Sequence, residues 1–261
     1  MKRILIINLI IFLTTHLSYS SDKPPILKPK LDAKESTDYN GKRAITNEGS
    51  LGGEFVFEEG LGSVAIIKSD LNGKNALKFE PQSNRKEESE NLPCIYFENI
   101  PESFPDGLTA EFRIKPEPTP FLNKVYEIFS ARASDRGPGL GIFYQAAYGD
   151  HINVVSGDGG VDALIWGIRK YDTQENPVVY GQWLHVTVVY DIEKLQFLLY
   201  LNGKLTKESE TGLELTPLDP IATIGAYRKG YAYPFFGEMT DIAIYDYVRT
   251  PEQIQDAAAL Q

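Results

Sequence analysis

The chain has 261 residues, 42% hydrophobic and 11% aromatic, enough to bury the core of one large β domain or two small ones. Its formal net charge of −10 repels phosphate backbones and excludes nucleic acid as a natural partner. Cys94 is the single cysteine, which excludes an internal disulfide. Beside Ile95-Tyr96-Phe97, this thiol is expected to be a small core residue.

The N-terminus has the parts of a secretory signal peptide. Met1-Lys2-Arg3 is basic, an apolar run extends from Ile4 to Leu13, and Ser18-Tyr19-Ser20 supplies small residues before a cleavage point. We predict that residues 1–20 are removed and that the mature protein is secreted, periplasmic or at the cell surface. The apolar run is too short to span a bilayer, so no membrane insertion is expected after cleavage.

Residues 21–30 are rich in Pro and Lys and are predicted to form an extended leader. Residues 31–261 are predicted to form one all-β domain, because short apolar runs recur between Gly, Asp and Pro turns, which is typical of a sandwich. A helix is expected from Pro251 to Leu260, with Thr250 as its N-cap. The expected strands are 54–58, 64–68, 76–79, 95–97, 108–114, 125–131, 139–145, 152–155, 163–169, 221–227 and 235–245.

The stretch from Gln182 to Lys204 is the strongest structural signal. It begins with an expected strand, 183–190, in which both parities are largely apolar, so both faces of that strand should be covered. A second apolar run ends at Asn202-Gly203, two residues that tolerate the positive φ of a type I′ turn. We therefore expect this hairpin to lie at the centre of a sheet.

The same hairpin carries a family resemblance. Gln182 to Val186, followed by Leu199 to Gly203, resembles the central motif of laminin-G-like jelly-roll domains in the concanavalin A-like lectin/glucanase superfamily. Three further segments, given at the end of this paragraph, also resemble the family, and four motifs in the family's order form a specific signal. The resemblance implies a two-sheet antiparallel jelly-roll sandwich with a short C-terminal helix. The other three segments that resemble the family are Gly73 to Phe79, Leu108 to Pro116, and Phe235 to Tyr245 followed by Thr250 to Ile254.

The closing strand contains an irregularity. Met239 and the later pair Ile242 and Ile244 have opposite parity, which predicts a β-bulge near Thr240-Asp241. In the family that the chain resembles, an aspartate at this point often helps hold a structural calcium ion, so the resemblance implies that role for Asp241. The family often has two adjacent aspartates, and here Thr240 replaces the first. The alternative is that Asp241 caps the bulge through backbone hydrogen bonds.

A run of aromatic residues between the last two expected strands is the best candidate for ligand recognition. Tyr227, Tyr231 and Tyr233 lie around Arg228, and tyrosine can stack on a sugar ring while keeping a hydroxyl for hydrogen bonds. The alternative, that these aromatics close the end of the core, is favoured for Phe235 and Phe236. Two further predicted platform residues, on other strands, are Trp166 and Tyr144.

The sequence lacks the usual catalytic patterns. Retaining glycoside hydrolysis needs two carboxyl groups about 5–5.5 Å apart, whereas Glu111 is the lone acid on its expected strand and shares a face with Arg113, a natural ion-pair partner. His185 is expected to be a satisfied buried imidazole. Asp158 and Asp162 flank a Gly-Gly turn that could wrap calcium, but a plain tight turn is favoured. We therefore do not expect an enzyme.

These observations lead to three hypotheses about function. The first is a secreted, non-catalytic binding module that recognises carbohydrate or a cell-surface glycan, so that its expected partner is a carbohydrate or a cell-surface glycoprotein. The second is a structural or protein-adhesion domain at the cell surface. The third, a divergent glycoside hydrolase, is disfavoured by the missing pair of carboxylates. A structural Ca²⁺ is the one cofactor that the resemblance implies.

Overall fold

The computed structural model of the protein describes residues 23–32, 35–37, 41–82, 92–118, 125–134, 138–145, 151–157, 164–167 and 178–259, with only the backbone given for 36–37, 151 and 164–167. The expected signal peptide lies outside these residues, as does the turn between Asp158 and Asp162. Among the described residues, no helix is both long and apolar enough to cross a membrane.

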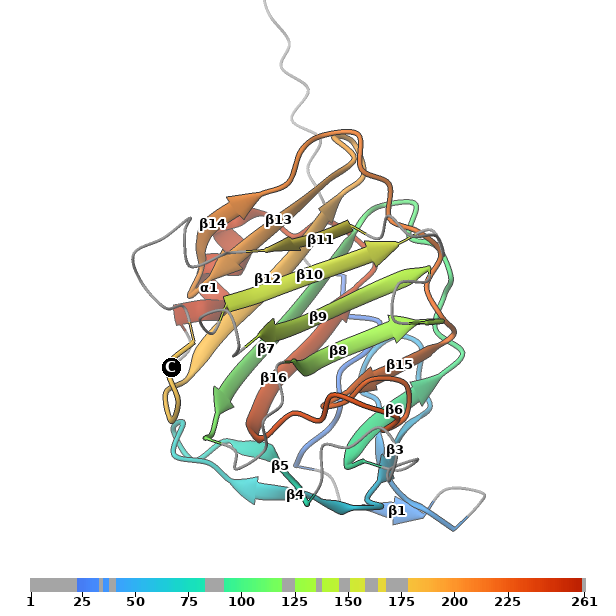
Figure 1. Cartoon of the computed structure of the whole chain (residues 1–261), viewed down its shortest axis with the longest axis vertical. Helices are drawn as coiled ribbons and strands as arrows, with labels where there is room; N and C mark the ends of the chain where they lie inside the picture. The colour runs from blue at the N-terminus through green and yellow to red at the C-terminus, as the bar shows by residue number, and fades with distance from the viewer. Residues whose placement is uncertain are drawn as a thin grey trace, which may run out of the picture.

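Two antiparallel sheets form the predicted jelly-roll sandwich, and their strands cross one another in the view of Figure 1. Within the described ranges, the larger sheet has nine strands in the order β1-β2-β3-β6-β15-β8-β9-β10-β11. Its strands are β1 (Ser36–Thr37), β2 (Arg43–Thr46), β3 (Glu54–Glu58), β6 (Cys94–Glu98), β15 (Ile221–Ile224), β8 (Tyr126–Arg132), β9 (Gly139–Gln145), β10 (His151–Gly157) and β11 (Leu164–Gly167).

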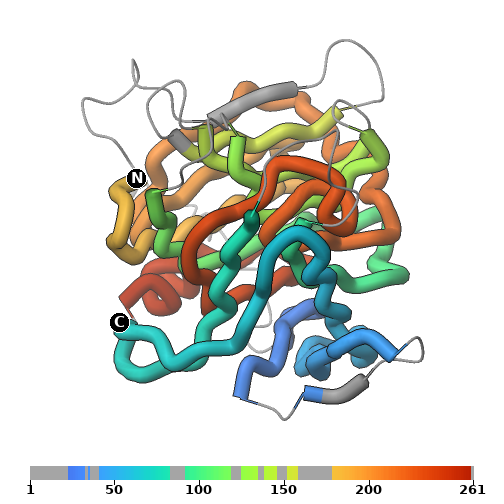
Figure 2. Tube along the Cα trace, turned by 60° about the horizontal axis from the view of Figure 1, so that its bottom comes forward, coloured from blue at the N-terminus to red at the C-terminus, as the bar shows by residue number. Residues whose placement is uncertain are grey.

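The smaller sheet has seven strands, also counted over the described residues, in the order β14-β13-β12-β7-β16-β5-β4. Figure 2 shows its β4–β5 hairpin in cyan at the front, beside the N-terminal strands in blue. The strands are β14 (Lys204–Glu208), β13 (Gln196–Leu201), β12 (Leu184–Asp191), β7 (Leu108–Pro116), β16 (Gly237–Tyr245), β5 (Asn75–Pro81) and β4 (Gly62–Lys68). The helix α1 (Pro251–Ala259) follows β16.

The central hairpin has the predicted form. β12 pairs with β13 on one side and β7 on the other, so it lies inside the seven-stranded sheet. Asn202 and Gly203 both have positive φ, 49° and 77°, as a type I′ turn requires. The Asn202 side chain also accepts a 3.0 Å hydrogen bond from the His185 backbone N–H, which fixes the turn against the start of β12.

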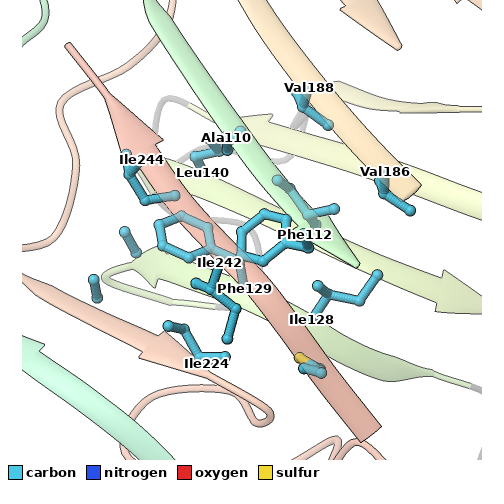
Figure 3. Close-up of a cluster of buried hydrophobic side chains, with 14 of the residues drawn as sticks. Ala110, Phe112, Ile128, Phe129, Leu140, Val186, Val188, Ile224, Ile242 and Ile244 are labelled. Atoms are coloured by element: carbon cyan, nitrogen blue, oxygen red, sulfur yellow. The ribbon is translucent and has the colours of Figure 1, made fainter. Parts of the chain in front are cut away.

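The core lies between the two sheets, as Figure 3 shows. Phe112 of β7 and Phe129 of β8 meet across the layers, with ring centroids 5.8 Å apart. Val186 and Val188, whose side chains point inward from β12, belong to the same buried cluster. Alternation along each strand therefore places one set of side chains in the core and leaves the other for the outer faces.

Helix α1 covers part of the outer face of the seven-stranded sheet. Ile254 packs against Val189, Leu198 and Tyr200, which have the outward parity of β12 and β13. Thr250 is the N-cap as predicted: it exchanges hydrogen bonds with Gln253, from Gln253 N–H to Thr250 Oγ1 (3.3 Å) and from Thr250 N–H to Gln253 Oε1 (2.9 Å). Both faces of β12 are thus covered, as its apolar sequence predicts.

The expected leader is extended but packs into the domain, which corrects the boundary at residue 31. Ile26 and Leu27 are 3% and 1% exposed and belong to the main core. Leu27 forms a β-bridge with Ile244 of β16, and Pro29 forms one with Asn47. The two apolar side chains explain the difference, because their burial stabilises the docked segment by about 1.5–3 kcal/mol each.

Candidate functional site

The segment between β15 and β16, residues 225–236, is called the aromatic loop below. Tyr231 is 41% exposed, whereas Tyr227 is only 2% exposed. The ring of Tyr227 contacts the rings of Tyr231 and Tyr233, with centroid distances of 6.3 and 6.0 Å. Tyr231 is therefore exposed to the solvent, and its ring packs against the buried ring of Tyr227.

Several residues of the aromatic loop have a left-handed backbone conformation. A left-handed backbone costs free energy at residues other than glycine and persists where the surroundings hold it, often at functional sites. The Lys229 N–H donates a 3.0 Å hydrogen bond to Thr223 Oγ1, and the Leu92 N–H donates a 2.7 Å bond to the Gly230 carbonyl. These bonds fix the loop before any ligand binds. The left-handed residues are Arg228 (φ 43°), Lys229 (51°), Gly230 (86°) and Tyr233 (55°).

A buried ion pair supports the loop from beneath. Arg132 Nη2 donates a 2.7 Å hydrogen bond to Glu127 Oε1, and the guanidinium carbon lies 4.9 Å from the centroid of the Tyr227 ring. The Glu127 N–H donates a 2.9 Å bond to the Tyr233 carbonyl. This ion pair was not predicted from the sequence. The signal was present, because two charged residues in the apolar strand 126–132 must have partners when the strand is buried.

Tyr96 of β6 lies beside the aromatic loop, between two ammonium groups. Lys229 Nζ is 4.5 Å and Lys42 Nζ is 5.8 Å from its ring centroid. Lys229 forms an ion pair with Glu98, and Lys42 forms one with a neighbouring carboxylate of β3. Burial raises the pKa of the Tyr96 hydroxyl, which stays neutral at physiological pH. The loop is thus linked to β6 by charge as well as by its backbone.

The structure separates the predicted ligand-binding residues. Tyr227, Arg228, Tyr231 and Tyr233 share the aromatic loop, and Arg228 is exposed. Trp166 lies on β11, where its backbone is in register with Val154, and its side chain lies outside the described part of the chain.

Tyr144 requires a correction. It is 0% exposed, stacks on Tyr126 at 4.6 Å and meets Phe235 edge-on at 6.0 Å. Tyr144 is therefore part of the core, because it has the inward parity of β9 together with Ile142. Phe235 is also fully buried, as favoured from the sequence.

The expected bulge is present, but the surroundings of Asp241 do not fit a calcium ligand. The β16–β7 register shifts between Thr240 and Ala243, and Asp241 has φ 48°. Its carboxylate accepts hydrogen bonds from Arg113 Nε at 3.0 Å and from Lys74 Nζ at 2.9 and 3.2 Å. The Asp241 carboxylate therefore already has two positively charged partners, Arg113 and Lys74, and both would repel a calcium ion. Throughout the described residues, no group of three or more His, Cys, Asp or Glu side chains is arranged to hold a metal ion.

Glu111 and Arg113 do not pair with each other, although they share a face of β7. Arg113 pairs with Asp241, whereas Glu111 pairs with Arg249, which follows β16. Glu111 is 3% exposed, and burial raises the pKa of its carboxyl group to about 7 against the opposing effect of Arg249. The expectation that Arg113 is the ion-pair partner of Glu111 is therefore wrong, because each residue pairs with a partner from a distant part of the chain.

His185 lies buried opposite Arg113 in the β12–β7 register. Burial and the nearby guanidinium lower the pKa of this imidazole to about 4. His185 is buried, as expected from the sequence, and its Nδ1 has no hydrogen-bond partner among the described protein groups. The same holds for Oγ1 of the neighbouring Thr187 and Oε1 of Glu111, which lies opposite Thr187. Buried polar atoms of this kind are usually satisfied by internal water.

The chain belongs to the family described as the concanavalin A-like lectin/glucanases superfamily, whose laminin-G-like profile matches residues 95–255. This range contains the central hairpin, the aromatic loop and the bulge. A comparison with curated proteins finds no match.

Solved structures share the fold at low sequence identity. The binding domain of botulinum neurotoxin serotype D has a TM-score of 0.62 at 16% identity, over 92% of this chain and 52% of that one. The serotype D ligand-binding domain in complex with N-acetylneuraminic acid gives 0.62 at 15%, over 92% and 51% of the two chains. The serotype G binding domain gives 0.59 at 16%, over 90% and 50%. The chain therefore spans about half the length of these domains, and the similarity establishes the fold alone.

Proposed function

We propose that the protein is an exported, non-catalytic carbohydrate-binding module and that the aromatic loop is its principal contact with the glycan. The family supports this assignment, because it includes lectins. The glycan complex of a structural neighbour agrees with it in general terms. Since this chain spans only half of that neighbour, no ligand or contact residue is transferred from it.

The exposed ring of Tyr231, supported by Tyr227 on a fixed loop, is the observation that carries the proposal. A sugar presents an apolar face of C–H groups that stacks on such a ring, while its hydroxyls accept and donate hydrogen bonds at the edge. Arg228 is exposed beside Tyr231 and offers donors to those hydroxyls. Because the loop is already ordered, little conformational entropy is lost when a glycan binds.

Glycan-array binding followed by titration of the best glycan tests the proposal. Tyr231→Ala is expected to weaken binding about tenfold or more, because truncating an aromatic residue at the centre of a binding contact typically costs about 2 kcal/mol or more. Leu205→Ala is the matched control: it also removes an exposed apolar side chain, 45% exposed, but from the edge strand β14 of the other sheet. This control should bind like the wild type.

The opposite results would reject the proposal in distinct ways. A blank array together with specific capture of a purified envelope protein would favour the adhesion hypothesis. Glycan binding that is equally strong in Tyr231→Ala would place the contact elsewhere on the domain. Turnover of a bound polysaccharide would contradict the non-catalytic assignment.

A further inference from the structure

Two turns of the seven-stranded sheet have the same sequence. Residues 71–74 lie between β4 and β5, residues 201–204 connect β13 to β14, and both read Leu-Asn-Gly-Lys. Their backbones also agree, since φ is 50° and 67° at the central Asn and Gly of the first turn and 49° and 77° at those of the second. Local sequence and backbone conformation therefore give Asn72 and Asn202 the same intrinsic reactivity, and only their surroundings differ.

An asparagine followed by glycine is prone to deamidation. The glycine nitrogen loses its proton and bonds to the asparagine Cγ, the side-chain nitrogen departs as ammonia, and a cyclic succinimide forms. Water then opens the ring at either carbonyl, giving aspartate or isoaspartate, so that one water is consumed and one ammonia released. Glycine favours the attack because it has no side chain to obstruct it. The reaction needs a side chain that is free to rotate and a backbone with room to move.

The first turn meets both requirements. Asn72 and Gly73 are exposed, and the Asn72 side-chain amide has no hydrogen-bond partner among the described residues. A 3.0 Å bond from the Lys74 N–H to the Leu71 carbonyl closes the turn and does not involve the Gly73 nitrogen. A Cβ atom on Gly73 would have no neighbour within 4 Å. Nothing in the described part of the chain therefore holds Asn72 away from the succinimide geometry.

The second turn is held from two sides. The His185 N–H donates a 3.0 Å bond to Asn202 Oδ1, and the Asn202 N–H donates a 2.8 Å bond to the His185 carbonyl. Helix α1 covers the glycine, because a Cβ atom on Gly203 would lie 3.0 Å from Ala258 Cβ and 3.1 Å from Gln255 Cα. Rotation of the Asn202 amide towards the Gly203 nitrogen breaks the first bond, and the helix blocks movement of the backbone.

We propose that Asn72 is a site of spontaneous deamidation in the folded protein and that His185 and α1 protect Asn202 from the same reaction. Deamidation of Asn72 needs no ligand and is independent of the proposed function. The new carboxylate is accommodated, because Lys68 Nζ already lies 3.4 Å from the Gly73 carbonyl and supplies a positive charge at this turn. The isoaspartate product also lengthens the main chain just before Lys74, which pairs with Asp241.

Incubation of the folded wild type at mildly alkaline pH, followed by peptide mapping that separates asparagine, aspartate and isoaspartate, tests the proposal. Asn72 is expected to convert about tenfold or more faster than Asn202, because the hydrogen bonds of Asn202 must open before it can react. The same incubation in guanidinium chloride is the matched control. Both asparagines should convert at equal rates there, since the unfolded chain retains only the shared tetrapeptide.

Ile254→Ala tests the source of the protection. Ile254 is fully buried and anchors α1 on β12 and β13, so its truncation loosens the helix without changing the turn. Conversion of Asn202 should become severalfold faster in this variant, while that of Asn72 stays the same. Tryptophan fluorescence checks that the domain remains folded, and the wild-type comparison holds without this variant.

Three results would overturn parts of the proposal. Equal conversion of Asn72 and Asn202 in the folded wild type would overturn it altogether. A difference that persists in guanidinium chloride would overturn the assignment to tertiary structure. An unchanged rate at Asn202 in folded Ile254→Ala would remove α1 from the protection and leave His185 alone in that role.

Discussion

Arg113 Nε donates a 3.0 Å hydrogen bond to the Asp241 carboxylate, joining the middle of β7 to the bulge of β16. The same guanidinium uses Nη2 to donate to the carbonyls of Ala257 (2.8 Å) and Ala258 (3.2 Å) at the end of α1. The last carbonyls of a helix have no partner within it, so this contact satisfies them and holds the helix on the sheet.

Replacing Arg113 should destabilise the whole domain. Arg113→Met keeps much of the apolar stem but leaves the α1 carbonyls and part of the Asp241 charge without a partner, so we expect the free energy of unfolding to fall by about 2–3 kcal/mol. Urea denaturation followed by tryptophan fluorescence measures the change. Lys23→Met is the control, since it removes an exposed ion pair with Asp246 and should cost less than about 1 kcal/mol. Equal effects of the two substitutions would contradict the role of Arg113.

Removal of calcium should have no effect on stability. The family resemblance predicts that Asp241 helps hold the ion, but Lys74 and Arg113 already neutralise this carboxylate. We therefore expect the melting temperature to be the same in excess EDTA and in millimolar calcium. A ligand that binds the folded state raises the melting temperature as its concentration increases. A calcium-dependent rise that disappears in Asp241→Asn would restore the metal site.

The pH dependence of stability should contain a component from His185. Its pKa is about 4 in the folded protein, against 6.5 for the exposed side chain, so the unfolded state binds more protons between these values. Stability is therefore lost as the pH falls from 6.5 towards 4. His185→Gln should remove this loss, an effect of about 1–3 kcal/mol, measured as the difference between denaturation curves at pH 7 and pH 4.5.

Glu111 should contribute to the pH dependence of stability in the opposite direction to His185. Its pKa is about 7 in the folded protein, against 4.5 for the exposed side chain, so the folded state binds more protons between these values and stability falls as the pH rises through them. On acidification, Glu111 therefore adds stability while His185 removes it. Glu111→Gln should make the net loss of stability at low pH larger, and His185→Gln should make it smaller. Parallel pH profiles for the two variants would show that neither group titrates as proposed. The charged groups that influence His185 are Arg113, Asp241, Arg249 and Lys74.

Local patterns in the sequence predicted most of the strands and the C-terminal helix, although β1 and β2 were not predicted. The apolar residues on both parities of 184–190 predicted that both faces of β12 are covered. Asn202-Gly203 predicted the turn that follows β13. The parity change after Met239 located the bulge. These features depend on residues within a few positions of one another, where backbone geometry alone fixes the direction of each side chain.

Tertiary structure decided which side chains meet. Arg113 and Asp241 are 128 positions apart, and Arg132 reaches Tyr227 from another strand. Tyr144, expected on a binding platform, proved to be in the core, and Ile26 and Leu27 joined the core instead of a free leader. Such contacts follow from the order of strands in the sheets, which closes long loops of chain and leaves no local periodicity. The sequence by itself therefore determined most of the strands, the central turn and the family. The partners of each buried charge and the surface left for a ligand were set only by the packing of distant segments.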